Sequence, residues 1–151
     1  MIRIAIIDDA VEIGTQLETI LIEITTNKGI AIDIDIYYSG KGLCEHLQNG
    51  EFYDLIFLDI EMDDTNGFDA AEELMSGSAK PLIVFVTKST EYTIRGYDVA
   101  FHYLVKPLNE AKFHEVLKRA LRLIIPQYFT FSSNGELYRI PVQEILYFES
   151  R

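Results

Sequence analysis

The chain has 151 residues, 48% of them hydrophobic and 25% charged, which suits one domain with a buried core, alone or with a fragment of another. A formal net charge of −11 argues against a surface built mainly to hold nucleic acid, because such surfaces are basic. The lone cysteine, Cys44, excludes an internal disulfide bond and a multi-cysteine metal site. We find no apolar run near the ~20 residues of a membrane-spanning helix and no signal-peptide pattern, and therefore expect a cytoplasmic protein.

Strand-like and helix-like patterns alternate five times over residues 1–125. Apolar runs and period-two alternation predict strands, and apolar residues at helical spacing predict amphipathic helices. In chain order the pattern predicts a strand at 2–7, a helix from Ile13 to before Gly29, a strand at 31–36, a helix between Ser39 and Asn49, a strand at 55–58, a helix from Phe68 to near Gly77, a strand at 81–86, a weak helix at 90–97, a strand at 101–105 and a helix at 113–124. This order predicts an α/β fold, a doubly wound five-stranded parallel sheet in a three-layer sandwich.

Residues 126–151 follow a different pattern. Asn134-Gly135 is a hairpin turn signal between two strand-like runs, and no helix-like stretch follows. An isolated hairpin is only marginally stable in water, so we expect a linker and the first strands of a second, β-rich domain. The sequence thus predicts one domain at 1–125 and the start of another, a short β extension, at 126–151.

Polar side chains stand at the ends of four predicted parallel strands. Asp8-Asp9 and Asp59 follow the first and third strands, and Thr87 and Lys106 end the fourth and fifth. Because ligands bind at the carboxyl ends of the strands in a doubly wound sheet, we expect these side chains to converge on one edge. Each alone has a simpler explanation, such as a helix cap for Asp8-Asp9 or a surface charge for Lys106. Their joint placement favours a site.

The residue types in this set point to phosphoryl chemistry. Three carboxylates in one place repel one another unless a cation neutralises them. With no His or Cys in the set, Mg²⁺ fits better than zinc, since Mg²⁺ is held by one or two carboxylates, water and a phosphate. The ammonium of Lys106 can hold a phosphoryl oxygen, and a carboxylate beside a divalent ion can form an aspartyl phosphate.

Five segments, IAIIDDA, YDLIFLDIEM, NGFDAAEEL, IVFVTKS and FHYLVKPL, together resemble the motifs of bacterial response-regulator receiver domains, in order over roughly residues 1–124. The resemblance implies a flavodoxin-like (CheY-like) fold. It also implies a signalling domain rather than an enzyme, which accepts a phosphoryl group from a sensor histidine kinase and hydrolyses only its own phosphate.

By this resemblance Asp59 is the phosphoacceptor. Asp9 is a direct Mg²⁺ ligand, Asp8 supports the metal site next to Asp9, and Glu61 offers its backbone carbonyl to the metal. The acceptor loop then runs from Asp59 to Gly67, which we expect to supply the backbone freedom of a tight turn.

The resemblance also assigns a switch and reveals two departures from the family pattern. Thr87 and Lys106 match the phosphate-sensing pair, and Tyr103 matches the aromatic switch that packs inward on activation, although a half-buried strand aromatic would look the same.

The family commonly has proline at the position of Asp63 and a small residue at that of Lys88. Our hypotheses are that Asp63 loosens the loop or changes metal affinity, and that Lys88 slows access of water and lengthens the phosphorylated lifetime.

The tail FTFSSNGELYRIPVQEILYFES resembles the opening strands of a LytTR-type (LytR/AlgR family) DNA-binding domain, above all in IPVQEILYFES. We therefore expect these residues to come from a longer transcription regulator, whose missing C-terminal part binds DNA and which forms a homodimer on phosphorylation. Residues 1–151 themselves are expected neither to bind DNA specifically nor to contact a membrane.

Two alternatives differ in class from this interpretation. Haloacid-dehalogenase-like phosphohydrolases also use an aspartyl phosphate and carry a second acid two residues later, as Glu61 stands here, but they need further acid motifs. A receiver-like interaction module that never meets phosphate is the other alternative, and the intact set of polar strand-end residues argues against it.

Overall fold

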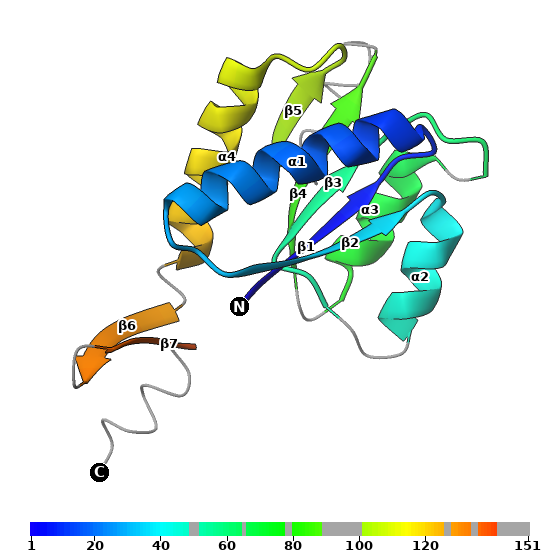
Figure 1. The fold of residues 1–151 in the computed structure, drawn as a ribbon. Coiled ribbons are helices and arrows are strands. Elements are labelled where there is room, and N and C mark those ends of the chain that lie inside the picture. The colour runs from blue at the N-terminus through cyan, green and yellow to red at the C-terminus, as the bar shows by residue number, and fades with distance from the viewer. Residues whose placement is uncertain are drawn as a thin grey trace. The chain divides into compact units, whose positions relative to one another are not determined.

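The computed structural model describes residues 1–48, 52–64, 66–77, 80–88, 101–125, 128–133 and 136–141. The weak helix predicted at 90–97 lies outside these residues. The elements in chain order are β1 (Ile2–Ile7), α1 (Val11–Asn27), β2 (Ile32–Tyr37), α2 (Gly40–Gln48), β3 (Leu55–Leu58), α3 (Gly67–Met75), β4 (Leu82–Thr87), β5 (His102–Val105), α4 (Glu110–Ile124), β6 (Tyr128–Ser133) and β7 (Glu136–Pro141) (Figure 1). None of the described helices is long and apolar enough to cross a membrane.

Five parallel strands form one sheet in the order β2-β1-β3-β4-β5. In this register Ile6 of β1 lies between Ile36 of β2 and Phe57 of β3. The chain builds one side of the sheet from β1 to β2 and then reverses to build the other side from β3 to β5. This confirms the predicted doubly wound parallel sheet and puts the reversal between β1 and β3, where such sheets bind ligands.

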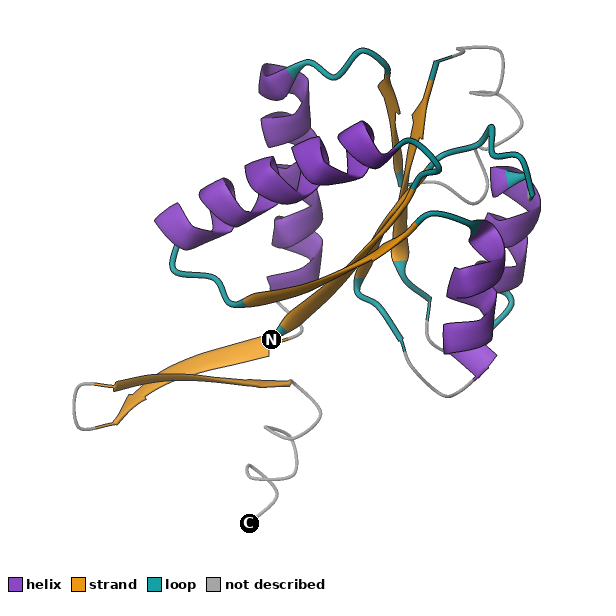
Figure 2. Ribbon diagram, turned by 45° about the vertical axis from the view of Figure 1, so that its right-hand side comes forward, coloured by secondary structure: helices purple, strands orange, loops and turns teal. Residues whose placement is uncertain are grey.

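Helices cover both faces of the sheet, which Figure 2 shows nearly edge-on. α1 lies on one face and buries a stripe that includes Leu21. α2 and α3 lie on the other face, where Leu43 and Phe68 join a buried cluster with alternate residues of β1, β3 and β4. Phe57 points away from that cluster, and Phe113 in the first turn of α4 stacks on it with ring centroids 5.4 Å apart. The predicted three-layer arrangement is confirmed.

Some predicted boundaries differ from those observed. α1 begins at Val11, whereas the sequence pattern predicted a start at residue 13. Val11 and Glu12 in the first turn are exposed and so do not belong to the buried apolar stripe from which the start was predicted. α4 likewise begins at Glu110, before its apolar stripe. α1 ends before Gly29 as predicted, since Gly29 has a φ of 67°, which glycine adopts without steric cost.

The chain divides into two compact units, Met1–His114 and Glu115–Arg151. In the second unit β6 and β7 pair antiparallel, with Ser133 opposite Glu136. This pairing is the hairpin that Asn134-Gly135 predicts, although those two residues lie outside the described ones. The domain boundary after residue 125 stays a prediction.

Gly67 opens α3 and lies against the backbone of the loop that follows β3. Its N–H donates to the carbonyl of Ile60 at 2.9 Å. A β-carbon at this position would overlap the carbonyl oxygen of Asp59 and lie 2.6 Å from the Cα of Ile60. Its φ is not in the left-handed region, so the prediction that Gly67 supplies turn freedom is wrong. Glycine is needed here because the two backbone segments approach so closely.

We predict that Gly67→Ala destabilises the fold by about 1 to 3 kcal/mol, because the new methyl group forces the backbone at Asp59 and Ile60 apart. Urea unfolding measures this loss. Gly77→Ala, just beyond the other end of α3, is the matched control, since its β-carbon would meet Leu74 O at an ordinary 3.7 Å. Equal losses in the two variants would contradict the close-approach explanation.

Candidate functional site

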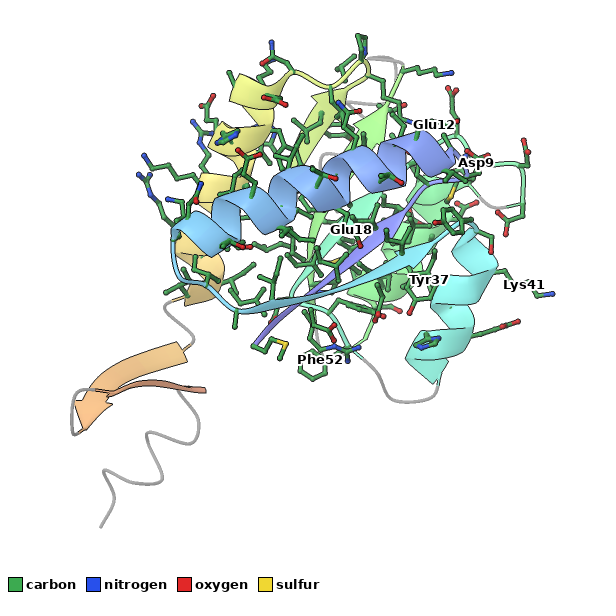
Figure 3. The ribbon with its side chains drawn as sticks, in the orientation of Figure 1. Asp9, Glu12, Glu18, Tyr37, Lys41 and Phe52 are labelled. Carbon is green, nitrogen blue, oxygen red and sulfur yellow. The ribbon has the colours of Figure 1, made fainter. Side chains whose placement is uncertain are left out.

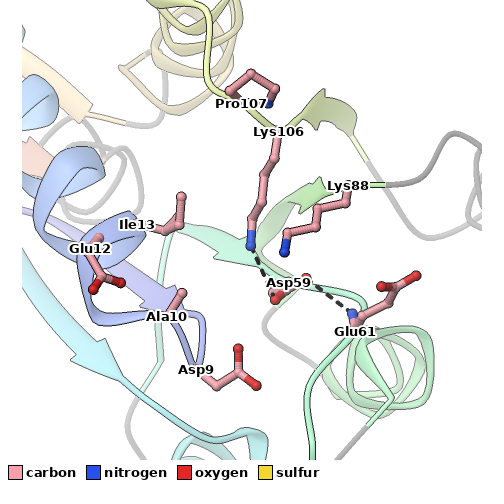
Figure 4. A pocket seen from close by; sticks show the side chains of 9 residues that line it. All are labelled: Asp9, Ala10, Glu12, Ile13, Asp59, Glu61, Lys88, Lys106 and Pro107. Carbon is pink, nitrogen blue, oxygen red and sulfur yellow. Dashed lines mark hydrogen bonds and ion pairs between the residues drawn. The ribbon is translucent and has the colours of Figure 1, made fainter.

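The polar residues that follow the strands meet at one edge of the sheet (Figure 4). Asp8 follows β1, Asp59 follows β3 and Lys106 follows β5. The Nζ of Lys106 lies 2.8 Å from Oδ2 of Asp8 and 3.4 Å from Oδ2 of Asp59. One carboxylate oxygen from each of Asp8, Asp9 and Asp59 lies within 4.8 Å of the others. Residues far apart in the sequence thus form a single charged cluster.

Burial controls the electrostatics of this cluster. The side chains of Asp8, Asp59 and Lys106 are 2%, 5% and 8% exposed. Burial and the charge of Asp8 raise the pKa of Asp59 to about 6, although Lys106 and the N–H of Glu61 act in the opposite direction. Burial by itself would lower the pKa of Lys106, but the carboxylates of Asp8 and Asp59 outweigh it and raise that pKa. Lys106 therefore stays charged at neutral pH.

Asp8 holds the turn that leads into α1. Its Oδ1 accepts a hydrogen bond from the N–H of Ala10 at 2.9 Å. Ala10 is the N-cap residue of α1 and no side chain caps it, so helix capping does not account for the Asp8-Asp9 pair. Oδ2 of Asp8 is buried and, despite the nearby Lys106 ammonium, accepts no hydrogen bond of good geometry from the described residues. This oxygen is suited to a cation or a water ligand of one.

A cavity of about 650 Å³ adjoins the cluster, within the range of small-ligand sites. Its walls include Asp9, Asp59, Glu61, Lys88 and Lys106 (Figure 4). Glu12 also lines it, and Figure 3 shows Glu12 and Asp9 together at the N-terminal end of α1. Sequence reasoning missed Glu12 because an exposed acid in the first turn of a helix is common and carries no strand-end signal.

The three carboxylates of the cluster fit Mg²⁺. Their possible ligand atoms are all oxygen, and Oδ2 of Asp8 is buried with the Lys106 ammonium 2.8 Å away but no hydrogen bond of good geometry from the described residues. Asp9 is exposed, and the adjoining cavity leaves room for the water molecules that Mg²⁺ retains. The cluster can therefore hold a hard cation and still admit an anionic group next to it.

The remaining predicted residues lie around the cluster rather than in it. Thr87 is fully buried, and its backbone carbonyl accepts from the N–H of Lys106 at 2.7 Å. Glu61 has an exposed side chain, and its N–H donates to Oδ1 of Asp59 at 3.1 Å. Tyr103 is half-buried, with its ring centroid 5.3 Å from that of Phe85.

We predict that Asp59→Asn stabilises the metal-free fold by about 1 to 2 kcal/mol at pH 7.5, a value discounted for solvent screening. The reason is the raised pKa of Asp59, from 3.8 to about 6: ionised Asp59 destabilises the folded state progressively above pH 4 and fully above pH 6. The gain should disappear near pH 4 and shrink when Mg²⁺ is added. Urea unfolding in the presence of EDTA at both pH values measures this gain. Asp63→Asn is the control, because Asp63 lies in an exposed loop. A gain in stability that does not depend on pH would contradict the explanation.

Solved structures with the same fold include receiver domains. The response regulatory domain of protein mrkE from Klebsiella pneumoniae aligns with a TM-score of 0.74 at 24% identity, over 83% of this chain and 100% of its own. A CheY-like response regulator receiver domain protein from Methanospirillum hungatei aligns with a TM-score of 0.69 at 25% identity, over 82% and 95% of the two chains. These likenesses confirm the predicted flavodoxin-like fold.

Curated relatives in sequence include sensory transduction proteins. The protein LytT of Bacillus anthracis is 31% identical over 120 residues, which are 79% of this chain and 47% of the relative. LytT of Bacillus subtilis is 39% identical over 67 residues, 44% of this chain and 28% of the relative. The chain thus spans about half the length, or less, of these relatives.

The family model of the response regulator receiver domain matches residues 4–118. That range contains all of the strand-end residues described above, from Asp8 to Lys106, and the whole five-stranded sheet beyond the first residues of β1. The sequence match, the fold and the acidic cluster agree, and the chain belongs to the response regulator receiver domain family.

Proposed function

We propose that this chain is the phosphorylation switch of a LytT-like transcription regulator, in which a sensor histidine kinase transfers a phosphoryl group to Asp59 in a Mg²⁺-dependent reaction. The observation that carries this proposal is the position of Asp59. Its buried carboxylate lies 3.4 Å from the Lys106 ammonium and close to the carboxylates of Asp8 and Asp9, beside a cavity. Membership of the receiver family supports the same role.

Asp59 is oriented to act as a nucleophile. Its Oδ1 accepts from the N–H of Glu61 and its Oδ2 faces Lys106, so the carboxylate is held before a donor arrives. A pKa of about 6 leaves most of it ionised at pH 7. One carboxylate oxygen attacks phosphorus, the bond from phosphorus to the donor breaks, and the leaving group departs with that electron pair.

Asp9 and Asp59 would hold Mg²⁺ directly, together with the backbone carbonyl of Glu61. Asp8 would not bind the ion directly but would support these ligands. When bound, the ion supplies positive charge against the carboxylates and the phosphoryl oxygens. Asp8 can fill the supporting role because its Oδ1 is already fixed by the N–H of Ala10 while its Oδ2 stays without an aligned donor among the described residues.

The transfer would change the contacts of Lys106 and Thr87. Lys106 would bond a phosphoryl oxygen in place of part of its present contact with Asp8 and Asp59, and the hydroxyl of Thr87 would move toward another. Thr87 pairs with Val105 at the end of β4 and β5, and Tyr103 packs on Phe85 two residues earlier on each strand. A shift at the site would therefore reach Tyr103, which is the switch that the family resemblance implies.

The output of the switch would be control of transcription by the longer protein. Relatives named sensory transduction protein LytT and LytR extend well beyond the part that this chain matches. The antiparallel pairing of β6 and β7 agrees with the start of a β-rich, LytTR-type DNA-binding domain. Phosphorylation would promote homodimerisation, and DNA would be bound through the domain that follows.

We predict that acetyl phosphate and Mg²⁺ add one phosphoryl group to this chain and none to Asp59→Asn, because Asp59 is the nucleophile. Intact-mass spectrometry measures the adduct, and EDTA should prevent it. The absence of an adduct in the parent chain at every Mg²⁺ concentration would favour the phosphate-independent module. Continuous turnover of a phosphomonoester would favour the phosphohydrolase instead.

A further inference from the structure

Lys88 places a second ammonium group at the cavity. It follows directly after β4, and its side chain extends into the cavity toward Asp59 and Lys106 (Figure 4). The side chain is exposed, and it makes no ion pair or hydrogen bond with another described residue. The four-carbon stem of lysine lets such a group move to meet an incoming charge.

The two lysines at the cavity differ in what already holds them. Lys106 is 8% exposed and lies within 3.4 Å of two buried carboxylates, which already offset its positive charge before a phosphoryl group arrives. Lys88 has no such contact to lose among the described residues. A phosphoryl group that arrives at Asp59 therefore meets one engaged ammonium and one unengaged ammonium.

The surroundings of Lys88 make its charge matter more than that of an ordinary surface lysine. The cavity wall also carries Asp9, Glu12 and Glu61, whose charges repel an anionic phosphoryl donor. A mobile positive charge on the same wall offsets part of this repulsion at the place where the donor must enter. Its effect should fall with ionic strength, as expected for an exposed charge.

We propose that Lys88 is a second phosphoryl-binding residue, whose ammonium contacts the phosphoryl oxygens of the donor as they approach Asp59 and speeds transfer. This inference rests on the proposed phosphorylation of Asp59. Lys88 forms no covalent bond and exchanges no proton in the step. With acetyl phosphate, the Asp59 oxygen bonds to phosphorus, the phosphorus–oxygen bond of the donor breaks, and acetate leaves with the electron pair.

Two substitutions separate the charge of Lys88 from its length. Lys88→Met keeps an unbranched side chain of similar size without the charge, and Lys88→Arg keeps the charge. Lys80→Met is the matched control, because Lys80 is exposed and stands near the start of the same strand, at the opposite edge of the sheet. It changes the net charge of the protein by the same amount.

The experiment is a time course of the phosphoryl adduct by intact mass, with acetyl phosphate and saturating Mg²⁺, at low and at high salt. We expect Lys88→Met to slow phosphorylation by about three- to tenfold at low salt, Lys88→Arg to stay within about twofold of the parent, and Lys80→Met to match the parent. High salt should slow the parent more than it slows Lys88→Met.

Phosphorylation of Lys88→Met at the parent rate would overturn the inference. Equal slowing of Lys88→Met and Lys80→Met would overturn it as well, because the effect would then come from the net charge of the protein and not from the position of Lys88. A loss of rate in Lys88→Arg equal to that in Lys88→Met would overturn it too, because the charge would then not be the cause. Failure of the proposed function looks different, since the parent chain itself would then acquire no adduct.

Discussion

Two buried carboxylates share one ammonium at the carboxyl ends of the strands, and this imbalance of charge sets the electrostatics of the site. Lys106 contacts both Asp8 and Asp59, and one positive charge cannot offset two buried negative charges together with the nearby Asp9. One result is the raised pKa of Asp59. Another is that the buried Oδ2 of Asp8 accepts no well-aligned hydrogen bond from the described residues. An added cation would offset this excess negative charge, which is what the proposed transfer of a phosphoryl group to Asp59 requires.

The cluster keeps its geometry because it is attached to buried strands. Asp8 and Asp59 leave β1 and β3, which lie side by side and are largely buried. The chain after Asp59 then turns back on itself, where the N–H of Gly67 bonds the carbonyl of Ile60. The close packing of the strands on both faces keeps Asp8 and Asp59 in fixed positions relative to each other.

A continuous set of aromatic contacts leads from the start of α3 to the edge strand β5. The ring centroids of Phe68 and Phe85 are 5.1 Å apart, and those of Phe85 and Tyr103 are 5.3 Å apart. Tyr103 is only half-buried, so of the three rings it has the most freedom to change position. These ring contacts form the packed path that coupling between the site and this surface requires.

The sequence by itself determined the alternation of strands and helices, because apolar spacing is a local property, and with it the doubly wound sheet. It also placed Asp8, Asp9, Asp59, Thr87 and Lys106 at strand ends, and a parallel sheet gathers strand ends at one edge. Tertiary structure decided what depends on distances between segments. Gly67 proved to be a close-approach residue rather than a turn residue, because only the folded loop brings Asp59 against it. Glu12 joined the cavity wall, and Lys106 proved to be engaged while Lys88 has no described partner, because burial and side-chain direction arise only when the strands are packed together.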